Sequence, residues 1–203
     1  MEFKDITLQD RDWMRQLLGY SDNQATEFNF TVLYIWRDIM RSKVCRDGDY
    51  FVVKFHPKDE PAPMYLYPAG RGTEQQLKQL LEQCMADARE NGFPFHMTSV
   101  QQEQKEVIES LFPDKFSFDL VRDIYDYIYS AEDLTFLRGK KYQSKRNFIS
   151  RFKKQEGWSY EPVGEENLKE CARMSISWCA RYGCGKDPSM ASESCSVKNA
   201  LAN

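Results

Sequence analysis

The sequence predicts a globular α/β or α+β fold in which helices pack on a sheet. The first observation is composition: hydrophobic residues make up 41% and aromatic residues 14% of 203 residues. This is enough to build a core and is untypical of disordered chains. The second observation is that strand-like segments alternate with segments of helical periodicity, as expected when helices cover a sheet.

The N-terminal segments predict a strand followed by two helices. Residues 2–6 resemble a short strand, and Thr7 or Asp10 is a candidate cap for a helix that ends near Leu18. Its apolar face consists of Trp13, Met14, Leu17 and Leu18. We expect a second helix over residues 24–42, where apolar side chains recur at helical spacing. They are Phe28, Val32, Trp36, Ile39 and Met40.

The middle of the chain predicts strands at residues 50–55 and 64–68, separated by a proline-rich loop. A capping box formed by Thr73 and Gln76 then begins a helix that Gly92 ends. Its apolar residues are Leu77, Leu80, Leu81, Cys84, Met85 and Ala88. The segments that follow predict a strand at 93–100, a helix at 101–112, and one long or two short strands at 116–130.

The turn Gly70-Arg71-Gly72-Thr73 lies between a predicted strand and a predicted helix. Backbone N–H groups at such a junction can hold a phosphate, so this is a candidate phosphate turn. A tight turn before a capped helix is the alternative that we favour, because only one short Gly-x-Gly is present.

Positive charge is concentrated between residues 137 and 154, which contain eight Lys or Arg and no acid. The whole chain has a net charge of −3, with 28 basic and 31 acidic residues. Cations and acids are normally interspersed on protein surfaces. The segment is therefore a candidate for binding an anion.

Ser144 is a candidate N-cap of a helix within the basic segment, with Lys145, Arg146 and Asn147 in its first turn. Cations there oppose the helix dipole unless a phosphate or carboxylate binds. We expect Lys140, Lys141, Lys145, Arg146 and Asn147 to contact an anionic part of a substrate. Alternatives are lysine stems that cover the core while their charges reach solvent, an ordinary solvated face, RNA binding and peripheral membrane contact.

Several classes of site are disfavoured. The six cysteines form no CxxC pair and both histidines lie far from the cysteine-rich end, so we expect no metal and interpret the cysteines as buried or idle thiols. There is no GxSxG, and the catalytic residues stay unknown. Gly139-Lys140-Lys141 lacks the glycine and hydroxyl of a P-loop. Without a signal-peptide pattern or an 18-residue apolar run, we expect a cytoplasmic protein with no transmembrane segment.

A weak internal repeat is also visible. Residues 2–18 and residues 159–178 share the order of a strand, a polar capping stretch and a helix. The repeat suggests a duplication, and the second copy would then be incomplete, since only about 45 residues follow Gly157.

Four phrases of the sequence, taken together, carry a family resemblance. They are FNFTVLYIWR, YPAGRG, LFPDKF and RDIYDYIYSAEDLTFLRGKKYQSKRNFISRF. They resemble a bacterial family related to the C-terminal catalytic part of phosphatidylglycerol lysyltransferases. The likeness runs from Asp10 to the end, and its most specific element is the tyrosine-rich strand followed by Leu-x-Gly-Lys-Lys and Lys-Arg-Asn.

The resemblance implies an α+β fold of the acyl-CoA N-acyltransferase type, with a mixed sheet flanked by helices, in two tandem domains. Residues 1–157 would form the first domain, and residues 158–203 the start of a second, truncated one. It also implies transfer of an aminoacyl or acyl group from aminoacyl-tRNA or acyl-CoA to an amine or hydroxyl. No cofactor is certain beyond such a donor, and tRNA, an anionic small molecule or a phospholipid headgroup is the expected partner. The alternatives are a non-catalytic RNA- or anion-binding module and a CoA-dependent N-acetyltransferase.

Overall fold

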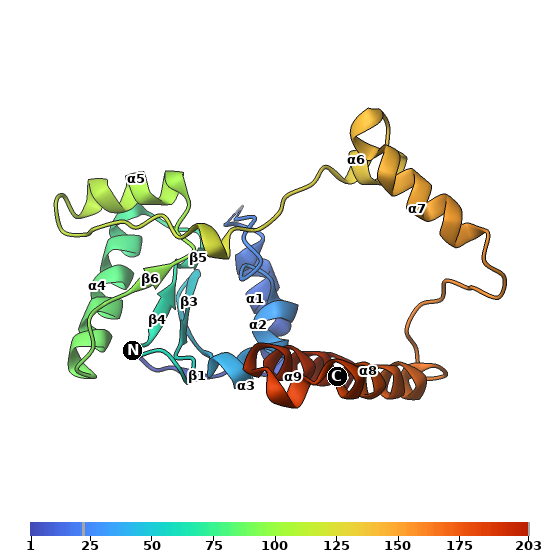
Figure 1. The fold of residues 1–203 in the computed structure, drawn as a ribbon. Helices are drawn as coiled ribbons and strands as arrows, with labels where there is room; N and C mark the ends of the chain where they lie inside the picture. Colours follow the sequence, from blue (N-terminus) through green and yellow to red (C-terminus); the bar gives the residue numbers. More distant parts are fainter. Residues whose placement is uncertain (22, 203) are drawn as a thin grey trace. The chain divides into compact units, whose positions relative to one another are not determined.

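The computed structural model describes residues 1–21 and 23–202, which form two compact units (Figure 1). The first unit comprises Met1–Asp119 and Ala172–Asn203, and the second comprises Leu120–Cys171. The first unit contains a six-stranded, mostly antiparallel sheet with helices packed on it, which confirms the expected α+β class.

The sheet of the first unit has the strand order β1-β2-β3-β4-β6, and β5 pairs with β3. Its strands are β1 (Lys4–Asp5), β2 (Lys43–Asp47), β3 (Tyr50–Phe55), β4 (Met64–Leu66), β5 (Ala69–Gly70) and β6 (Met97–Thr98). All neighbours are antiparallel except β4 and β6, which are parallel. The strands predicted at residues 2–6, 50–55, 64–68 and 93–100 are therefore present, although β1, β4 and β6 are shorter than expected.

The β2–β3 hairpin is the longest strand pair, and the sequence reading missed β2. Five residue pairs join the strands, from Lys43 with Lys54 to Asp47 with Tyr50. The loop is Gly48-Asp49, and Gly48 has φ 57°. Two-residue loops of this composition favour the turns that match strand twist. Together with the alternating segment Lys43–Asp47, this turn was the signal that could have located β2.

The helices of the first unit flank this sheet (Figure 1). They are η1 (Leu8–Asp10), α1 (Arg11–Leu18), α2 (Phe30–Ile35), α3 (Arg37–Met40), α4 (Glu74–Glu90), α5 (Gln102–Leu111), η4 (Cys184–Lys186) and α9 (Pro188–Ala202). The predicted helix over residues 24–42 is wrong in extent. The Asn29 side chain accepts a hydrogen bond from the Thr31 amide and begins α2 only there. Arg41, in the left-handed region at φ 49°, ends α3.

The central strand β3 is buried on both faces. Phe51, Val53 and Phe55 lie in one hydrophobic cluster with Met14 and Leu17 of α1. Val52 points to the other face and packs with a smaller cluster. That cluster contains Tyr65, Leu80, Cys84 and Ala88. The apolar face predicted for α4 is therefore confirmed, apart from the partly buried Met85.

A buried ionic group fastens α4 to the sheet. The Lys54 ammonium lies 2.6 Å from a carboxylate oxygen of Asp87, and the Tyr65 hydroxyl donates to the same oxygen. Burial raises the pKa of Tyr65, and the hydrogen bond to the Asp87 carboxylate raises it further. Burial also raises the pKa of the Cys84 thiol to about 12. Within this unit the group is structural, since the Lys54 ammonium and the Tyr65 hydroxyl both bond to Asp87.

The second unit consists of short helices joined by irregular segments. They are η2 (Arg122–Ile124), α6 (Ala131–Phe136), η3 (Lys140–Tyr142) and α7 (Gln143–Lys153), while α8 (Leu168–Tyr182) begins here and continues into the first unit. No residue of this unit is fully buried. The predicted strands at 116–130 are wrong: residues 116–130 form no ladder, because no described strand lies along them. The strand that the repeat places near residue 159 is also not formed.

The C-terminal helix α9 packs on α2 and α3. The Asn199 amide nitrogen lies 3.0 Å from the carbonyl oxygen of Ile35 and 3.2 Å from Asp38. A disulfide joins Cys179 and Cys184, so the interpretation of all cysteines as buried or idle thiols is wrong for this pair. The limits of the two compact units differ from residues 1–157 and 158–203. The tandem-domain division of the chain stays a prediction.

Candidate anion-binding site

The basic segment folds as a helix, a tight connection and a second helix. Ser130 caps α6 by accepting a hydrogen bond from the Asp133 amide. Leu137 ends α6 at φ 48°, and Gly139 has φ 84°, so the chain reverses within a few residues. The following helix α7 begins at Gln143. Ser144 is therefore inside the helix, and its prediction as the N-cap is wrong.

Arg146 holds this connection closed. One guanidinium nitrogen donates to the carbonyl oxygens of Leu137 and Gly139, the latter at 2.9 Å, and the other donates to Gln143. The Gly139 carbonyl also accepts the Tyr142 amide at 3.4 Å, and the planar guanidinium can reach both carbonyls. Arg146 is thus a structural residue of the connection as well as a surface cation.

Lys141 is paired with an acid that lies just before the basic segment. Its ammonium lies 2.9 Å from Asp133, which also accepts from the Tyr142 hydroxyl at 3.1 Å. The hydrogen bond from Lys141 lowers the pKa of Asp133, and the same bond raises the pKa of Lys141. Both side chains are exposed to solvent, so this pair contributes little to stability. Lys141 is less available to a ligand than the sequence suggested.

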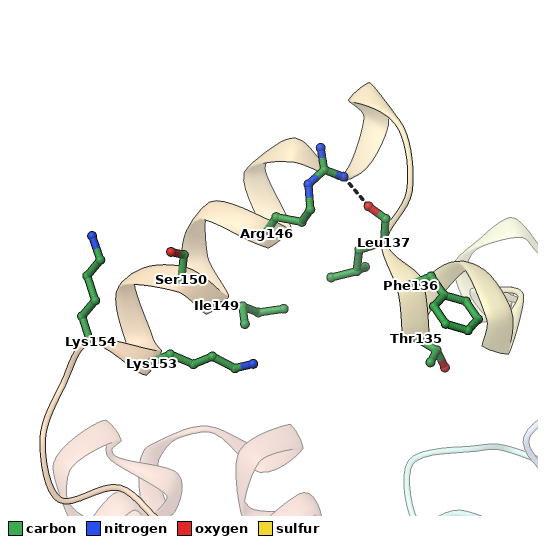
Figure 2. Close-up of a pocket in the computed structure, with 8 residues that line it drawn as sticks. All are labelled: Thr135, Phe136, Leu137, Arg146, Ile149, Ser150, Lys153 and Lys154. Atoms are coloured by element: carbon green, nitrogen blue, oxygen red, sulfur yellow. Dashed lines mark hydrogen bonds between the residues drawn. The ribbon is translucent and has the colours of Figure 1, made fainter.

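A cavity of about 510 Å³ lies between the end of α6 and one face of α7 (Figure 2). Its lining comprises Thr135, Phe136, Leu137, Arg146, Ile149, Ser150, Lys153 and Lys154. In Figure 2 the Ile149 and Leu137 side chains point toward each other, and the Lys153 side chain extends below them. The lining therefore combines three cations, two hydroxyls and apolar groups, with no carboxylate.

Five residues of the basic segment were predicted to contact an anion. Of these, the structure places only Arg146 at this cavity. Lys140 and Lys145 are exposed, and the Asn147 side chain accepts from Gln143 at 2.9 Å. Lys153 and Lys154 were not among the predicted residues, because the anion-binding site was predicted in the first turn of the helix. Helical spacing was the available signal: Arg146, Ser150 and Lys153 follow one another at intervals of four and three residues.

Close contacts with neighbouring residues account for the glycines of the Gly70–Thr73 turn. A Cβ on Gly70 would lie 2.0 Å from the Asp49 carbonyl oxygen, and one on Gly72 would lie 2.7 Å from the Tyr50 ring. The Arg71 amide donates to Asp49, and the Thr73 amide donates to Gln76 in the predicted capping box. The capped turn is confirmed. Two of its amides are thus engaged, and phosphate binding by the turn stays a prediction.

Other kinds of site find no support in residues 1–21 and 23–202. These residues contain no cluster of three or more His, Cys, Asp or Glu side chains suited to a metal ion. They also contain no helix with the length and apolarity needed to traverse a lipid bilayer.

A family model described as "Phosphatidylglycerol lysyltransferase, C-terminal" matches residues 20–199. A crystal structure of a conserved protein of unknown function from Bacteroides thetaiotaomicron is similar over 99% of this chain and 67% of its own. Its TM-score is 0.90, and the two sequences are 31% identical.

Two crystal structures of one Thermus thermophilus protein, a point mutant and the wild type, are also similar. Their TM-scores are 0.40 and 0.37, with 20% and 18% identity, and each match covers 64% of this chain and 99% of the other. No curated protein matches the chain.

Proposed function

Because the chain belongs to the family of the phosphatidylglycerol lysyltransferase C-terminal domain, we propose that it transfers an aminoacyl or acyl group from an anionic activated donor. The donor is an aminoacyl-tRNA or an acyl-CoA, and the acceptor is an amine or a hydroxyl. The family and the α+β architecture support a transferase of the acyl-CoA N-acyltransferase type. The identities of donor and acceptor are the proposal.

The observation that carries this proposal is the acid-free cavity beside α7. Arg146, Lys153 and Lys154 belong to the lining of a space of about 510 Å³, within the usual size range of small-molecule sites. Among the described residues, neither Lys153 nor Lys154 forms a salt bridge, so their charges are available to a ligand. Cations that line one cavity without acids favour phosphate groups, which both classes of donor carry.

The residues have different roles in this proposal. Arg146 keeps the connection between α6 and α7 in place, while Lys153 and Lys154 contact the phosphate of the donor. Exposed Lys140 and Lys145 extend the positive surface on the same unit. Leu137 and Ile149 supply an apolar wall against which a base or an acyl chain can pack.

The reaction needs no nucleophile from the protein. The nitrogen or oxygen of the acceptor attacks the carbonyl carbon of the donor ester or thioester and forms the new bond. The bond to the tRNA ribose oxygen or the CoA sulfur breaks, and the acceptor proton passes to that leaving group. Since the donor is already activated, binding contributes mainly alignment of the two reactants.

Charge reversal at the cavity tests the binding step. We expect Lys153→Glu/Lys154→Glu to weaken tRNA binding about tenfold or more and to reduce the salt slope by about one to two, as expected when phosphate contacts are lost. The measurement is filter binding across a salt series, with calorimetry of acetyl-CoA in parallel. Lys58→Glu/Lys198→Glu, which changes the net charge equally at exposed sites of the first unit, is the matched control.

Arg146→Glu is unsuitable as a first variant, because losing the carbonyl contacts would disturb the connection itself. Equal affinities for the cavity variant and its control would reject the site. Binding without transfer of any labelled aminoacyl or acyl group to amine or hydroxyl acceptors would favour the non-catalytic binding module.

A further inference from the structure

A second cavity, of about 590 Å³, lies in the first unit at the end of the sheet where β1 stops and β2 starts. Its walls come from β1, η1, α2, α3 and the residues that lead into β2. Figure 1 shows β1 and α3 next to each other at this end. Asp5 pairs with Lys43 here, whereas Gly70 pairs with Tyr50 at the opposite end of the strands. The cavity is therefore distinct from the Gly70–Thr73 turn, and it shares no residue with the cavity beside α7.

Arg37 is held in place on the wall of this cavity before any ligand binds. Its guanidinium lies 3.9 Å from the centre of the Tyr34 ring and donates a hydrogen bond of 2.6 Å to the Tyr34 carbonyl oxygen. The side chain is 22% exposed. The carbonyl bond leaves other N–H groups of the guanidinium for a ligand. A guanidinium that is already stacked loses little conformational entropy when it binds an anion.

The charges on the walls leave one cation in excess. The cations are Arg37, Arg41 and Lys43, and the acids are Asp5 and Asp38. Asp5 lies 3.8 Å from Lys43, and Asp38 lies 3.7 Å from Arg37. Within residues 1–21 and 23–202, the Arg41 side chain forms neither an ion pair nor a hydrogen bond. The cavity therefore has one uncompensated positive charge, which is on Arg41.

The backbone of Arg41 is unfavourable for an arginine. This residue ends α3 with φ 49° and ψ 43°, in the left-handed region. Glycine is the usual residue in this conformation at the end of a helix, because it has no Cβ. Strained residues gather at ligand sites, where the side chain is needed for binding. The position thus holds a residue that its backbone disfavours and that supplies the excess charge of the cavity.

We propose that this cavity binds a small organic anion with one carboxylate and a compact apolar body. Arg41 and Arg37 contact the carboxylate, whose two oxygens match the paired N–H groups of a guanidinium. Leu8, which is 42% exposed, and Tyr34 line the same space and contact the apolar body. The volume lies within the usual range of small-molecule sites.

The excess charge favours a carboxylate over a phosphate monoester. A carboxylate carries one negative charge, which the one uncompensated cation balances. A phosphate monoester carries about two negative charges at pH 7, and the second would face Asp5 and Asp38 without a cation of its own. Neither Lys153 nor Lys154 takes part, so the proposal stands or falls independently of the transferase proposal.

Nuclear magnetic resonance of the isotope-labelled protein tests the site, with benzoate as the probe and benzamide as its uncharged counterpart. We expect benzoate to shift the amide signals of residues 5–9 and 37–43 saturably, with a dissociation constant of about 1 mM or less. Benzamide and inorganic phosphate should bind at least tenfold more weakly. Arg41→Gln should weaken benzoate binding at least tenfold, because it removes the uncompensated charge. Lys58→Gln, which removes one positive charge at an exposed site of the first unit, should bind benzoate as the wild type does.

Arg41→Gly separates binding from folding. Glycine relieves the left-handed backbone and removes the guanidinium, so we expect a melting temperature no lower than that of the wild type together with at least tenfold weaker benzoate binding. A variant that melts well below the wild type would show that the fold needs this side chain, which would overturn the assignment of Arg41 to a ligand.

Three other results would overturn the proposal. They are the absence of saturable shifts with benzoate, equal binding of benzamide, and an unchanged affinity for benzoate in Arg41→Gln. Inorganic phosphate that binds more tightly than benzoate would overturn the choice of a carboxylate.

Discussion

The Asp10 carboxylate organises the start of the first unit. Its side chain is 3% exposed and accepts hydrogen bonds from Lys4 at 2.5 Å, from the amide and hydroxyl of Thr7 at 2.9 and 2.8 Å, and from Trp13 at 3.0 Å. Burial opposes the charged form, but the bonds from Lys4, Thr7 and Trp13 outweigh it and lower the pKa of Asp10. One carboxylate therefore joins β1, η1 and α1.

The free energy of unfolding at acid pH should reveal how much this carboxylate contributes to stability. Because the pKa of Asp10 is below 3.8 in the folded chain, its stabilisation is complete above that pH and is lost as pH falls through the folded pKa. We expect Asp10→Asn to lower the free energy of unfolding at pH 7 by about 1 to 3 kcal/mol and to make the loss on acidification shallower than in the wild type. Urea unfolding between pH 7 and pH 3 measures both effects.

Asp12→Asn is the control for this experiment, since the Asp12 side chain is 87% exposed and pairs only with its neighbour Arg11 among the described residues. Identical acid dependence in Asp10→Asn and the wild type would show that the carboxylate contributes no linked stability.

At the scale of elements, turns and caps decide where each helix and strand begins. Thr73 starts α4 as predicted. Its hydroxyl accepts a hydrogen bond from the Gln76 amide, and the Gln76 side chain accepts one from the Thr73 amide. Asn29 starts α2 several residues later than hydrophobic periodicity indicated. Periodicity identifies a face, but a local side-chain cap determines the end of a helix.

The β2–β3 hairpin depends on Gly48. Its φ of 57° is costly for a residue with a Cβ, and the space around that Cβ position is empty, so the cost is purely one of conformation. We expect Gly48→Ala to lower the free energy of unfolding by about 1 to 2 kcal/mol. Gly185→Ala is the matched control, since its Cβ also has open space and its φ is not positive. Equal urea midpoints for the two variants would contradict this role.

At the scale of the whole molecule, the two units differ in how they are stabilised. The first unit has a core on both faces of its sheet. The second has no buried residue and depends on local bonds such as those of Arg146 and Asp133. The free energy needed to open a segment locally rises with its number of buried apolar contacts and protected backbone hydrogen bonds.

Native-state hydrogen exchange should separate the two units. We expect the amides of β3 to exchange only by global unfolding, and those of α6 and α7 to exchange at least a hundredfold faster relative to their intrinsic rates. Exchange resolved by mass spectrometry of peptic fragments measures this. Protection of α7 equal to that of β3 would mean that the second unit unfolds together with the first.

Much of the first unit is predictable from local patterns. Local patterns in the sequence limited the fold to an α/β or α+β class. They also determined the position of β3, the capped helix α4 with its buried face and, in the second unit, the acid-free basic segment, because each depends on neighbours within a few residues. The family resemblance was also readable in the sequence, and the family model matches residues 20–199.

Tertiary structure decided which cations share a surface. Only the reversal at Leu137 and Gly139 shows that Arg146 is held by carbonyls, that Lys141 pairs with Asp133, and that Lys153 and Lys154 line the cavity. It also decided that residues 116–130 are not a strand within this chain, since a strand needs a partner that sequence pattern cannot supply. Charge and periodicity are properties of neighbouring residues, whereas the cavity depends on how α6 and α7 fold against each other, and a strand depends on a partner elsewhere in the chain.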